Sequence, residues 1–406
     1  MQQKNFDLII WGATGFTGQL VVEYLWKEYG KSDLKWAIAG RDSKKLEQVI
    51  SKFGMQGIPF LIADSFDLPS LKELASQTKV ICSTVGPYSM YGDALVKACV
   101  EESCNYCDLT GEVPWMRKTI DQYHHEAIAR KIKIVHSCGF DSIPSDLGVL
   151  EVQRTFFEKH GYYAGNVFTR IATLKGELSG GTYSSMSNLI TEARTDKSIQ
   201  KILSNTFALN PDPGYQGAEQ SDLKSVKKDK ITGLWICPFI MSGINTKIVR
   251  RSHALMNFPY GHKFIYKEAL MCGKGFTGWV KANAILLALG LFLAAKPGSF
   301  LKKIIDWKMP KPGEGPNEKS RNEGYFKFLI FAQGHNEDES IIAVRGDKDP
   351  GYGSTSRMLA ESAICLALGA QLPQVFGVLT PSVAMGKELL NRLETKAGVT
   401  FKVIEQ

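Results

Sequence analysis

The sequence has few of the residue patterns that bind metals or nucleic acids. Its eight cysteines include one Cys-x-x-Cys pair, Cys104 and Cys107, but neither a second such pair nor a pair of histidines completes a zinc site. It also has no basic stripe interleaved with aromatic residues, although the net charge is +8. We therefore expect no metal and no nucleic-acid partner. The positive charge favours other anions, such as a phosphorylated cofactor or an acidic lipid surface.

The N-terminal residues lack the pattern of a secretion signal. Met1–Asp7 is polar and leads straight into an apolar run, without a basic lead or a small-residue cleavage site. Scattered cysteines fit a reducing compartment. The expected location is therefore the cytoplasm, either free or peripheral on a membrane or lipid surface.

The first part of the chain alternates apolar runs with amphipathic segments. With 406 residues, the chain exceeds the size at which single cores usually stop growing, so more than one domain is expected. The apolar runs are Phe6–Ala13, Leu34–Arg41, Ile58–Asp64, Lys79–Gly86, Asn105–Leu109 and Ile132–Cys138. The segments between them have helical periodicity, which predicts an α/β Rossmann domain with a doubly wound parallel sheet over residues 1–161.

The rest of the chain predicts a different architecture. Apolar runs that read as strands are Val167–Leu174, Leu234–Met241, Tyr325–Ala332 and Ser340–Arg345. Longer connections favour antiparallel pairing, so residues 162–355 are expected to form an α+β domain with a mainly antiparallel sheet. Asn210–Lys230 reads as an exposed loop, and its charged end, Lys224–Lys230, as a solvated surface. The C-terminal residues 356–406 have helical periodicity and are expected to pack back on the Rossmann domain.

A glycine motif follows the first apolar run and opens a helix. In Gly12-Ala13-Thr14-Gly15-Phe16-Thr17-Gly18, the first glycine permits a tight turn and the last lets the helix pack closely on the sheet. Gly15 leaves room for a pyrophosphate, which the helix N-terminus would attract. The motif predicts a dinucleotide site, and its expected contact residues are Gly12, Thr14, Gly15, Phe16, Thr17 and Gly18.

The second strand indicates which dinucleotide is bound. It ends in Gly40-Arg41, where a domain that binds NAD would place an acidic residue for the ribose 2′-hydroxyl. Arg41, with Lys44 one turn later, suits a 2′-phosphate. Asp42 keeps the alternative open, because a small shift of register would bring its carboxylate to the ribose. NADPH is therefore preferred to NADH.

Other strand ends should complete the cofactor site, because ligands lie beyond the carboxyl ends of parallel strands. The residues expected there are Asp64 after the third strand, Val85, Gly86 and Pro87 after the fourth, and Gly111 after the fifth. Tyr88, Tyr91 and Asp141 are the candidate catalytic residues, because reduction of a double bond needs a proton donor beside the hydride carrier. Each has a structural alternative, as a wall of the pocket or a helix cap.

An apolar segment in the second half of the chain must be shielded from water. Ala284–Ala295 has large apolar side chains on every face of a helix, and Trp279, Lys281, Lys296 and Trp307 are among the aromatic and basic residues that flank it. The segment is shorter than the roughly 20 residues of a bilayer span. We expect a peripheral membrane contact through residues 279–307, with a buried core helix or a homodimer contact as the alternatives.

Several motifs together resemble those of the saccharopine dehydrogenase-like oxidoreductases, in the branch that includes trans-acting enoyl reductases. Besides the glycine motif, the matching segments are Val85–Tyr88, Asp108–Glu112, Gly139–Asp146, Lys311–Pro316, Gly346–Gly353, Met358–Ala363 and Gly377–Pro381. The resemblance implies an NAD(P)-dependent oxidoreductase that reduces an enoyl or other lipid-type acyl substrate in lipid or glycolipid metabolism. A non-catalytic NADPH-binding protein at a lipid surface and an amino-acid-type dehydrogenase are the alternatives.

Overall fold

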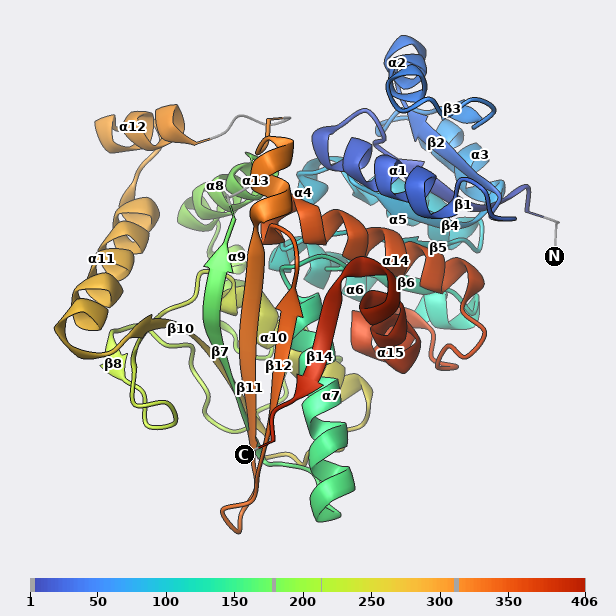
Figure 1. Cartoon of the computed structure of the whole chain (residues 1–406). Helices are drawn as coiled ribbons and strands as arrows, with labels where there is room; N and C mark the ends of the chain where they lie inside the picture. Colours follow the sequence, from blue (N-terminus) through green and yellow to red (C-terminus); the bar gives the residue numbers. More distant parts are fainter. Residues whose placement is uncertain (1–3, 177–179, 213, 310–313, 406) are drawn as a thin grey trace. The chain divides into compact units, whose positions relative to one another are not determined.

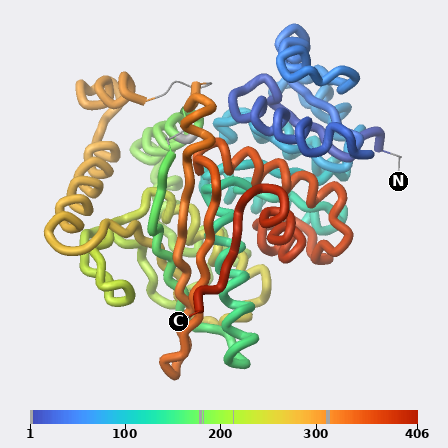
Figure 2. Tube along the Cα trace, viewed as in Figure 1, coloured from blue at the N-terminus to red at the C-terminus, as the bar shows by residue number. Residues whose placement is uncertain are grey.

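A computed structural model describes residues 4–176, 180–212, 214–309 and 314–405 (Figures 1 and 2). The chain folds as two compact units, each assembled from separate stretches of sequence. The first unit contains Met1–Ile143, Gly351–Gly398 and a short segment that ends at Pro316. The second contains Pro144–Lys311, Asn317–Pro350 and Val399–Gln406.

The first unit is built on a seven-stranded parallel sheet, which confirms the predicted Rossmann domain. In spatial order its strands are β13 (Gly377–Leu379), β6 (Lys133–Val135), β5 (Asn105–Cys107), β4 (Thr78–Ser83), β1 (Phe6–Trp11), β2 (Trp36–Gly40) and β3 (Phe60–Ile62). Leu8, Ile9 and Ile10 are fully buried in succession, because helices cover both faces of the sheet. β13, from late in the chain, extends the sheet beyond the predicted six strands.

The helices of this unit form two groups (Figure 1). One group contains α1 (Phe16–Tyr29), α2 (Ser43–Phe53), α14 (Thr355–Leu368) and α15 (Pro381–Arg392), and the other α3 (Leu68–Ser76), α5 (Asp93–Glu101) and α6 (Val113–Ala129). The unit also contains two shorter elements, α4 (Tyr88–Tyr91) and the π-helix η2 (Leu393–Ala397). A π-helical turn at Pro350–Ser354 leads into α14. Tyr24 and Tyr29 on α1 both donate to Glu361 on α14, so the late helices are bonded to the first one.

The second unit is built on a mainly antiparallel seven-stranded sheet, as predicted. Its strands, in spatial order, are β14 (Val399–Val403), β12 (Glu339–Gly346), β11 (Tyr325–Gln333), β7 (Asn166–Lys175), β10 (Ile265–Gly273), β9 (Trp235–Cys237) and β8 (Lys227–Lys228). Only β7 and β10 pair in parallel among the described strands of this sheet. Its helices are α7 (Ile143–His160), α8 (Gly180–Thr195), α9 (Lys197–Ser204), α10 (Ser242–Leu255), α11 (Gly275–Ala294), α12 (Phe300–Lys308) and α13 (Glu318–Glu323).

The boundaries between the units differ from those expected at residues 161 and 355. The first lies at Ile143, because α7 packs on the second sheet: a Cβ on Gly148 would lie 2.3 Å from Ile330 Cδ1. The C-terminal residues are not all helical, since Val399–Val403 forms the edge strand β14 beside β12. Tertiary pairing, which local periodicity does not report, decides both features.

α11 is longer than the apolar segment at residues 284–295 suggested. It has 20 residues, and an 18-residue window within it has a mean hydropathy of 1.6, so by length and composition alone it is long and apolar enough to cross a membrane. The expectation that this segment is too short therefore does not hold. Only 11% of its most apolar window is buried, so it is not a core helix. Gly278 and Ala282 are its buried residues, and they lie toward β9 and β10.

Candidate cofactor-binding site

The glycine motif forms the loop between β1 and α1 and is tightly packed at two of its three glycines. Gly12 has a φ of 86°, and a Cβ there would lie 2.5 Å from Val85 Cγ2. A Cβ on Gly18 would lie 2.1 Å from the carbonyl oxygen of Gly12. The Thr84 hydroxyl lies 3.1 Å from the same oxygen and holds the loop to the end of β4. These two glycines are therefore required by the fold itself.

Gly15 differs, because the protein leaves space beside it. It is exposed, has an extended backbone, and a Cβ there would meet nothing closer than the Gly12 carbonyl oxygen at 3.4 Å. It is also the N-cap of α1, and it has no side chain with which to cap the helix. The first turn of α1 contains no acidic residue, so no carboxylate of that turn neutralises the positive end of the helix dipole. The open side of this loop thus fits a phosphate group.

The structure places the predicted 2′-phosphate residues on the surface at the start of α2. Arg41 and Lys44 are exposed and follow Gly40, the last residue of β2. The Asp42 carboxylate is the N-cap of α2 and accepts a hydrogen bond from the Lys45 amide at 3.1 Å. Asp42 is therefore already engaged with its own helix, whereas Arg41 extends from the strand end.

At the end of β3, Asp64 shapes its own turn. Its Oδ1 accepts a hydrogen bond from the Phe66 amide at 2.9 Å, and its backbone amide donates to the Ser70 hydroxyl. The residue is only partly buried. It thus lies beyond the carboxyl end of the strand, where the sequence predicted it.

The end of β4 leads through Val85 and the exposed Gly86 into a cis peptide bond at Pro87 and then into α4. Glu112, the last residue of the Asp108–Glu112 motif, holds this turn. Its two carboxylate oxygens accept hydrogen bonds from the Tyr88 and Ser89 amides, each at 2.9 Å. Gly111 precedes it after β5, so the loops after β4 and β5 are bonded together at one edge of the sheet.

The three candidate proton donors occupy different environments. Tyr88 is buried, and its hydroxyl donates to the Ser83 carbonyl oxygen at 3.1 Å and accepts from the Leu109 amide. Desolvation raises its pKa well above the usual value. The Tyr88 hydroxyl is thus engaged with two backbone groups, which favours the structural alternative for this residue. Tyr91 is partly exposed, with its ring 5.6 Å from that of Phe66.

Asp141 has the most useful environment of the three. Its Oδ2 lies beside Gly111, at 3.8 Å from the position of a Cβ there, so the carboxyl group lies at the carboxyl edge of the sheet. Desolvation raises the pKa of Asp141 to about 6. A carboxylic acid with such a pKa is half protonated at about pH 6 and about one tenth protonated at pH 7, so it can act as a general acid.

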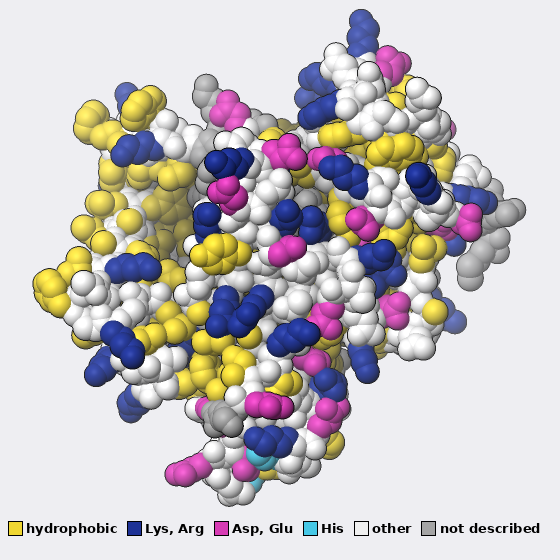
Figure 3. All heavy atoms as spheres, in the orientation of Figure 1, with side chains coloured by type: hydrophobic (Ala, Val, Ile, Leu, Met, Phe, Trp, Pro, Cys, Tyr) yellow, Lys and Arg dark blue, Asp and Glu magenta, His cyan; other side chains and the backbone are white. Residues whose placement is uncertain are grey.

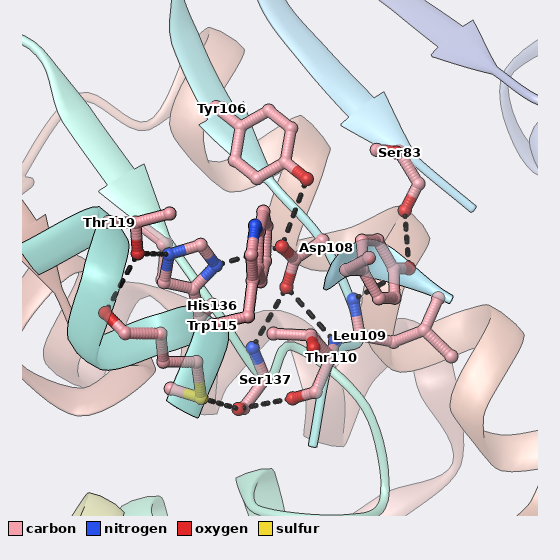
Figure 4. Close-up of polar contacts among 12 residues, drawn as sticks. Ser83, Tyr106, Asp108, Leu109, Thr110, Trp115, Thr119, His136 and Ser137 are labelled. Carbon is pink, nitrogen blue, oxygen red and sulfur yellow. Dashed lines mark hydrogen bonds and ion pairs between the residues drawn. The ribbon is translucent and has the colours of Figure 1, made fainter. Parts of the chain in front are cut away.

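A buried polar network supports the ends of β5 and β6, and sequence reasoning missed it (Figure 4). Asp108 Oδ2 accepts hydrogen bonds from Tyr106 at 2.9 Å and from His136 Nδ1 at 2.8 Å. Its Oδ1 accepts from the amides of Thr110 at 3.0 Å and Ser137 at 3.2 Å. One fully buried carboxylate thus fixes the two loops that precede Gly111 and Asp141.

The other side of the His136 ring is bonded as well. The Thr119 hydroxyl donates to the Met116 carbonyl oxygen at 2.8 Å and lies 2.9 Å from His136 Nε2. Both ring nitrogens of His136 therefore have a hydrogen-bonding partner, Asp108 at Nδ1 and Thr119 at Nε2. His136 and Asp108 thus form a buried hydrogen-bonded pair. The sequence feature that could have indicated this pair is an Asp at the end of one apolar strand and a His, 28 residues later, at the end of the next.

Phe16, predicted to contact the cofactor, is covered on one side by late segments of the same unit. Its ring lies 4.6 Å from that of Tyr352, edge to face, and a Cβ on Gly315 would lie 2.4 Å from its Cε1. The Tyr352 hydroxyl donates to the Glu314 carbonyl oxygen. The resemblance included both of these segments, but only the structure brings them to the glycine loop.

The described residues contain no group of three or more His, Cys, Asp or Glu side chains that could hold a metal ion.

The parallel sheet, the glycine loop and the polar strand ends define the chain as a Rossmann-type oxidoreductase that depends on NAD(P). Residues 8–135 match the family of the saccharopine dehydrogenase NADP-binding domain.

Full-length relatives give the family. A Mycobacterium tuberculosis protein named as a candidate trans-acting enoyl reductase is 36% identical over 98% of this chain and 97% of its own length. The trans-acting enoyl reductase of Mycobacterium leprae is 33% identical over 98% of both chains. The chain therefore belongs to the saccharopine dehydrogenase-like family, in the trans-acting enoyl reductase branch. Saccharopine dehydrogenase from Saccharomyces cerevisiae shares the fold, with a TM-score of 0.56 and 13% identity over 98% of this chain and 99% of that one.

Proposed function

We propose that this protein uses NADPH to reduce a carbon–carbon double bond in a lipid-type acyl substrate. The observation that carries the proposal is the full-length similarity, at 33–36% identity, to proteins named trans-acting enoyl reductases. Such a reduction adds a hydride to one carbon of the double bond and a proton to the other. NADPH, when bound, supplies the hydride.

The protein's own residues would bind the cofactor and supply the proton. The open side of Gly15, at the N-terminus of α1, fits the pyrophosphate. Asp141 holds a proton at its carboxyl group up to about pH 6 and lies beside Gly111 at the edge where the substrate would bind. Tyr91 is the second candidate donor. Asp108 and His136 fix the loops after β5 and β6, which carry Gly111 and Asp141.

The proposal is tested by turnover. Purified protein with NADPH should reduce 2-enoyl thioesters to the saturated thioesters, as followed by NADPH absorbance and by mass spectrometry of the product. Acyl chains of increasing length would define the substrate class. A lack of turnover on every enoyl substrate and on lipid extracts, with NADPH still bound, would favour a non-catalytic NADPH-binding protein. Reduction of a keto acid that requires an amine would favour an amino-acid-type dehydrogenase.

We expect Arg41 to determine the choice of cofactor. A hydrogen bond to a charged group contributes about 1.5–3 kcal/mol, so Arg41→Ala should weaken NADPH binding by roughly 10–100-fold. Binding of NADH should change little, because NADH lacks the 2′-phosphate. Fluorescence titration with both cofactors measures the difference, and Lys131→Ala, an exposed cation elsewhere in the same unit, is the control. Equal weakening of both cofactors would contradict the assignment.

Asp141 predicts a pH dependence of turnover. A general acid must be protonated, and the pKa of Asp141 is about 6, so the protonated fraction falls about tenfold per unit well above that pH. We expect kcat to fall in the same way between roughly pH 7 and pH 8. In Asp141→Asn the dependence should disappear and the rate should be low throughout. If Tyr91→Phe shows these changes and Asp141→Asn does not, the proton comes from Tyr91.

A further inference from the structure

Two consecutive helices of the second unit, α11 and α12, present apolar side chains to solvent (Figure 3). Nine large side chains on them are between 39% and 82% exposed. They are Phe276, Trp279, Val280, Leu287, Leu291, Leu293, Phe300, Ile304 and Trp307. A monomeric soluble protein rarely exposes such a contiguous surface unless it binds a partner or a membrane. We refer to these nine residues as the apolar face.

The helix pair is anchored, so the apolar face has a defined position on the second unit. Ala282 of α11 packs into a buried cluster with Cys237 and Cys272 at the β9–β10 side of the sheet. Near the other end of α11, Arg194 of α8 donates to the Leu293 carbonyl oxygen at 2.7 Å. The Tyr183 hydroxyl of α8 accepts a hydrogen bond from Lys302 at 3.0 Å and donates to Asp306, which ties α12 to α8.

The charge around the apolar face is mainly positive. Lys274, Lys281, Lys296, Lys303 and Lys308 are all exposed. α11 contains no acidic residue, and Asp306 of α12 is bonded to Lys302 and Tyr183. A symmetric contact with a second copy would bring these lysines toward one another, because both copies use the same surface. An anionic lipid surface instead matches their charge.

The topology of the second sheet excludes a simple transmembrane helix. Val167 on β7 pairs with Tyr266 on β10 in one direction and with Ala332 on β11 in the other. β10 ends just before α11, and β11 follows α12. If α11 crossed a membrane once, β10 and β11 would lie on opposite sides of it, although both strands bond to β7. α12 has nine residues and is too short to cross back. The helix pair must therefore remain on one side of a bilayer.

From these observations we infer that α11 and α12 insert side by side into one leaflet of an anionic membrane, with the apolar face in the acyl region and the flanking lysines at the phosphates. Trp279 and Trp307 would lie at the interface, where indole rings are favoured. The inference does not depend on the proposed reduction, although it would bring the protein to the phase that holds lipid-type acyl chains.

Vesicle flotation tests the inference. The full-length protein should float with vesicles of equal parts phosphatidylcholine and phosphatidylglycerol at low salt, and much less with phosphatidylcholine alone. Phe300→Ser with Trp307→Ser should abolish flotation without changing the melting temperature, because both side chains are exposed, by 79% and 82%. Phe66→Ser, at a residue that is 72% exposed in the first unit, is the matched control and should float normally.

The contribution of the lysine charges and the depth to which the tryptophans insert are tested separately. A lysine near an anionic surface contributes about 1 kcal/mol, so Lys296→Gln with Lys303→Gln should lower vesicle affinity about 30-fold, whereas Lys131→Gln with Lys387→Gln should not. Brominated lipid should quench tryptophan fluorescence in the wild type and less in Trp307→Phe. Failure of the wild type to bind vesicles would overturn the inference, as would a dimer in solution that Phe300→Ser with Trp307→Ser dissociates. Equal binding to neutral and anionic vesicles would contradict the anionic leaflet.

Discussion

The Gly15→Val variant is expected to bind NADPH at least about 100-fold more weakly than the wild type while unfolding at the wild-type temperature. The protein itself does not occupy the space beside Gly15, since a Cβ there would meet nothing closer than 3.4 Å. A valine side chain would instead fill the space at the N-terminus of α1 that fits the pyrophosphate. Loss of two charge-assisted hydrogen bonds at roughly 1.5–3 kcal/mol each gives the magnitude.

The neighbouring glycine of the same motif provides the contrast. A Cβ on Gly18 would lie 2.1 Å from the Gly12 carbonyl oxygen, so Gly18→Ala should lower the melting temperature whether or not cofactor is present. Calorimetric titration with NADPH and thermal unfolding of the two variants, side by side, separate binding from folding. If Gly15→Val retains wild-type affinity, the cofactor does not bind at this loop.

Removal of the Asp108 carboxylate should be the most damaging single change to the stability of the first unit. It would leave the Tyr106 hydroxyl, the two loop amides and the His136 ring without their shared acceptor in a fully buried place. A buried group left without its hydrogen-bonding partner costs about 1–3 kcal/mol, and four groups lose theirs here, so we expect Asp108→Ala to lower the free energy of unfolding by about 3–5 kcal/mol.

Denaturant unfolding, followed by a probe in the first unit, measures this effect. Asp67→Ala, at an exposed aspartate whose side chain does not cap the helix that follows it, is the control and should change the unfolding free energy by less than about 0.5 kcal/mol. Asp108→Asn should fall between the two, because one carboxamide oxygen replaces two acceptors. A loss below about 1 kcal/mol for Asp108→Ala would mean that the network does not hold the loops together.

Local sequence patterns were sufficient to predict the first sheet and its glycine loop. Runs such as Phe6–Ala13 match buried strands because both faces of a parallel sheet are covered. Segments between the runs are helical as expected, for example Ser43–Phe53. Gly12 and Gly18 have the tight geometry that the motif predicts, because the requirement lies within a few residues of chain. The antiparallel character of the second sheet also follows from the spacing of its strands.

Tertiary packing decided what the sequence did not. Tyr88 is placed by position near the cofactor, but its hydroxyl turns inward to Ser83. Asp229, in a stretch that reads as a solvated loop, is buried in a two-pronged ion pair with Arg170, at 2.9 and 3.0 Å. The sequence by itself determined the elements and the glycine loop, because those depend on neighbours along the chain. Which polar side chains face the interior depended on contacts between different strands and loops, such as the one between Arg170 and Asp229, 59 residues apart. Only the tertiary structure brings such partners together, and only it shows that α11 is left uncovered.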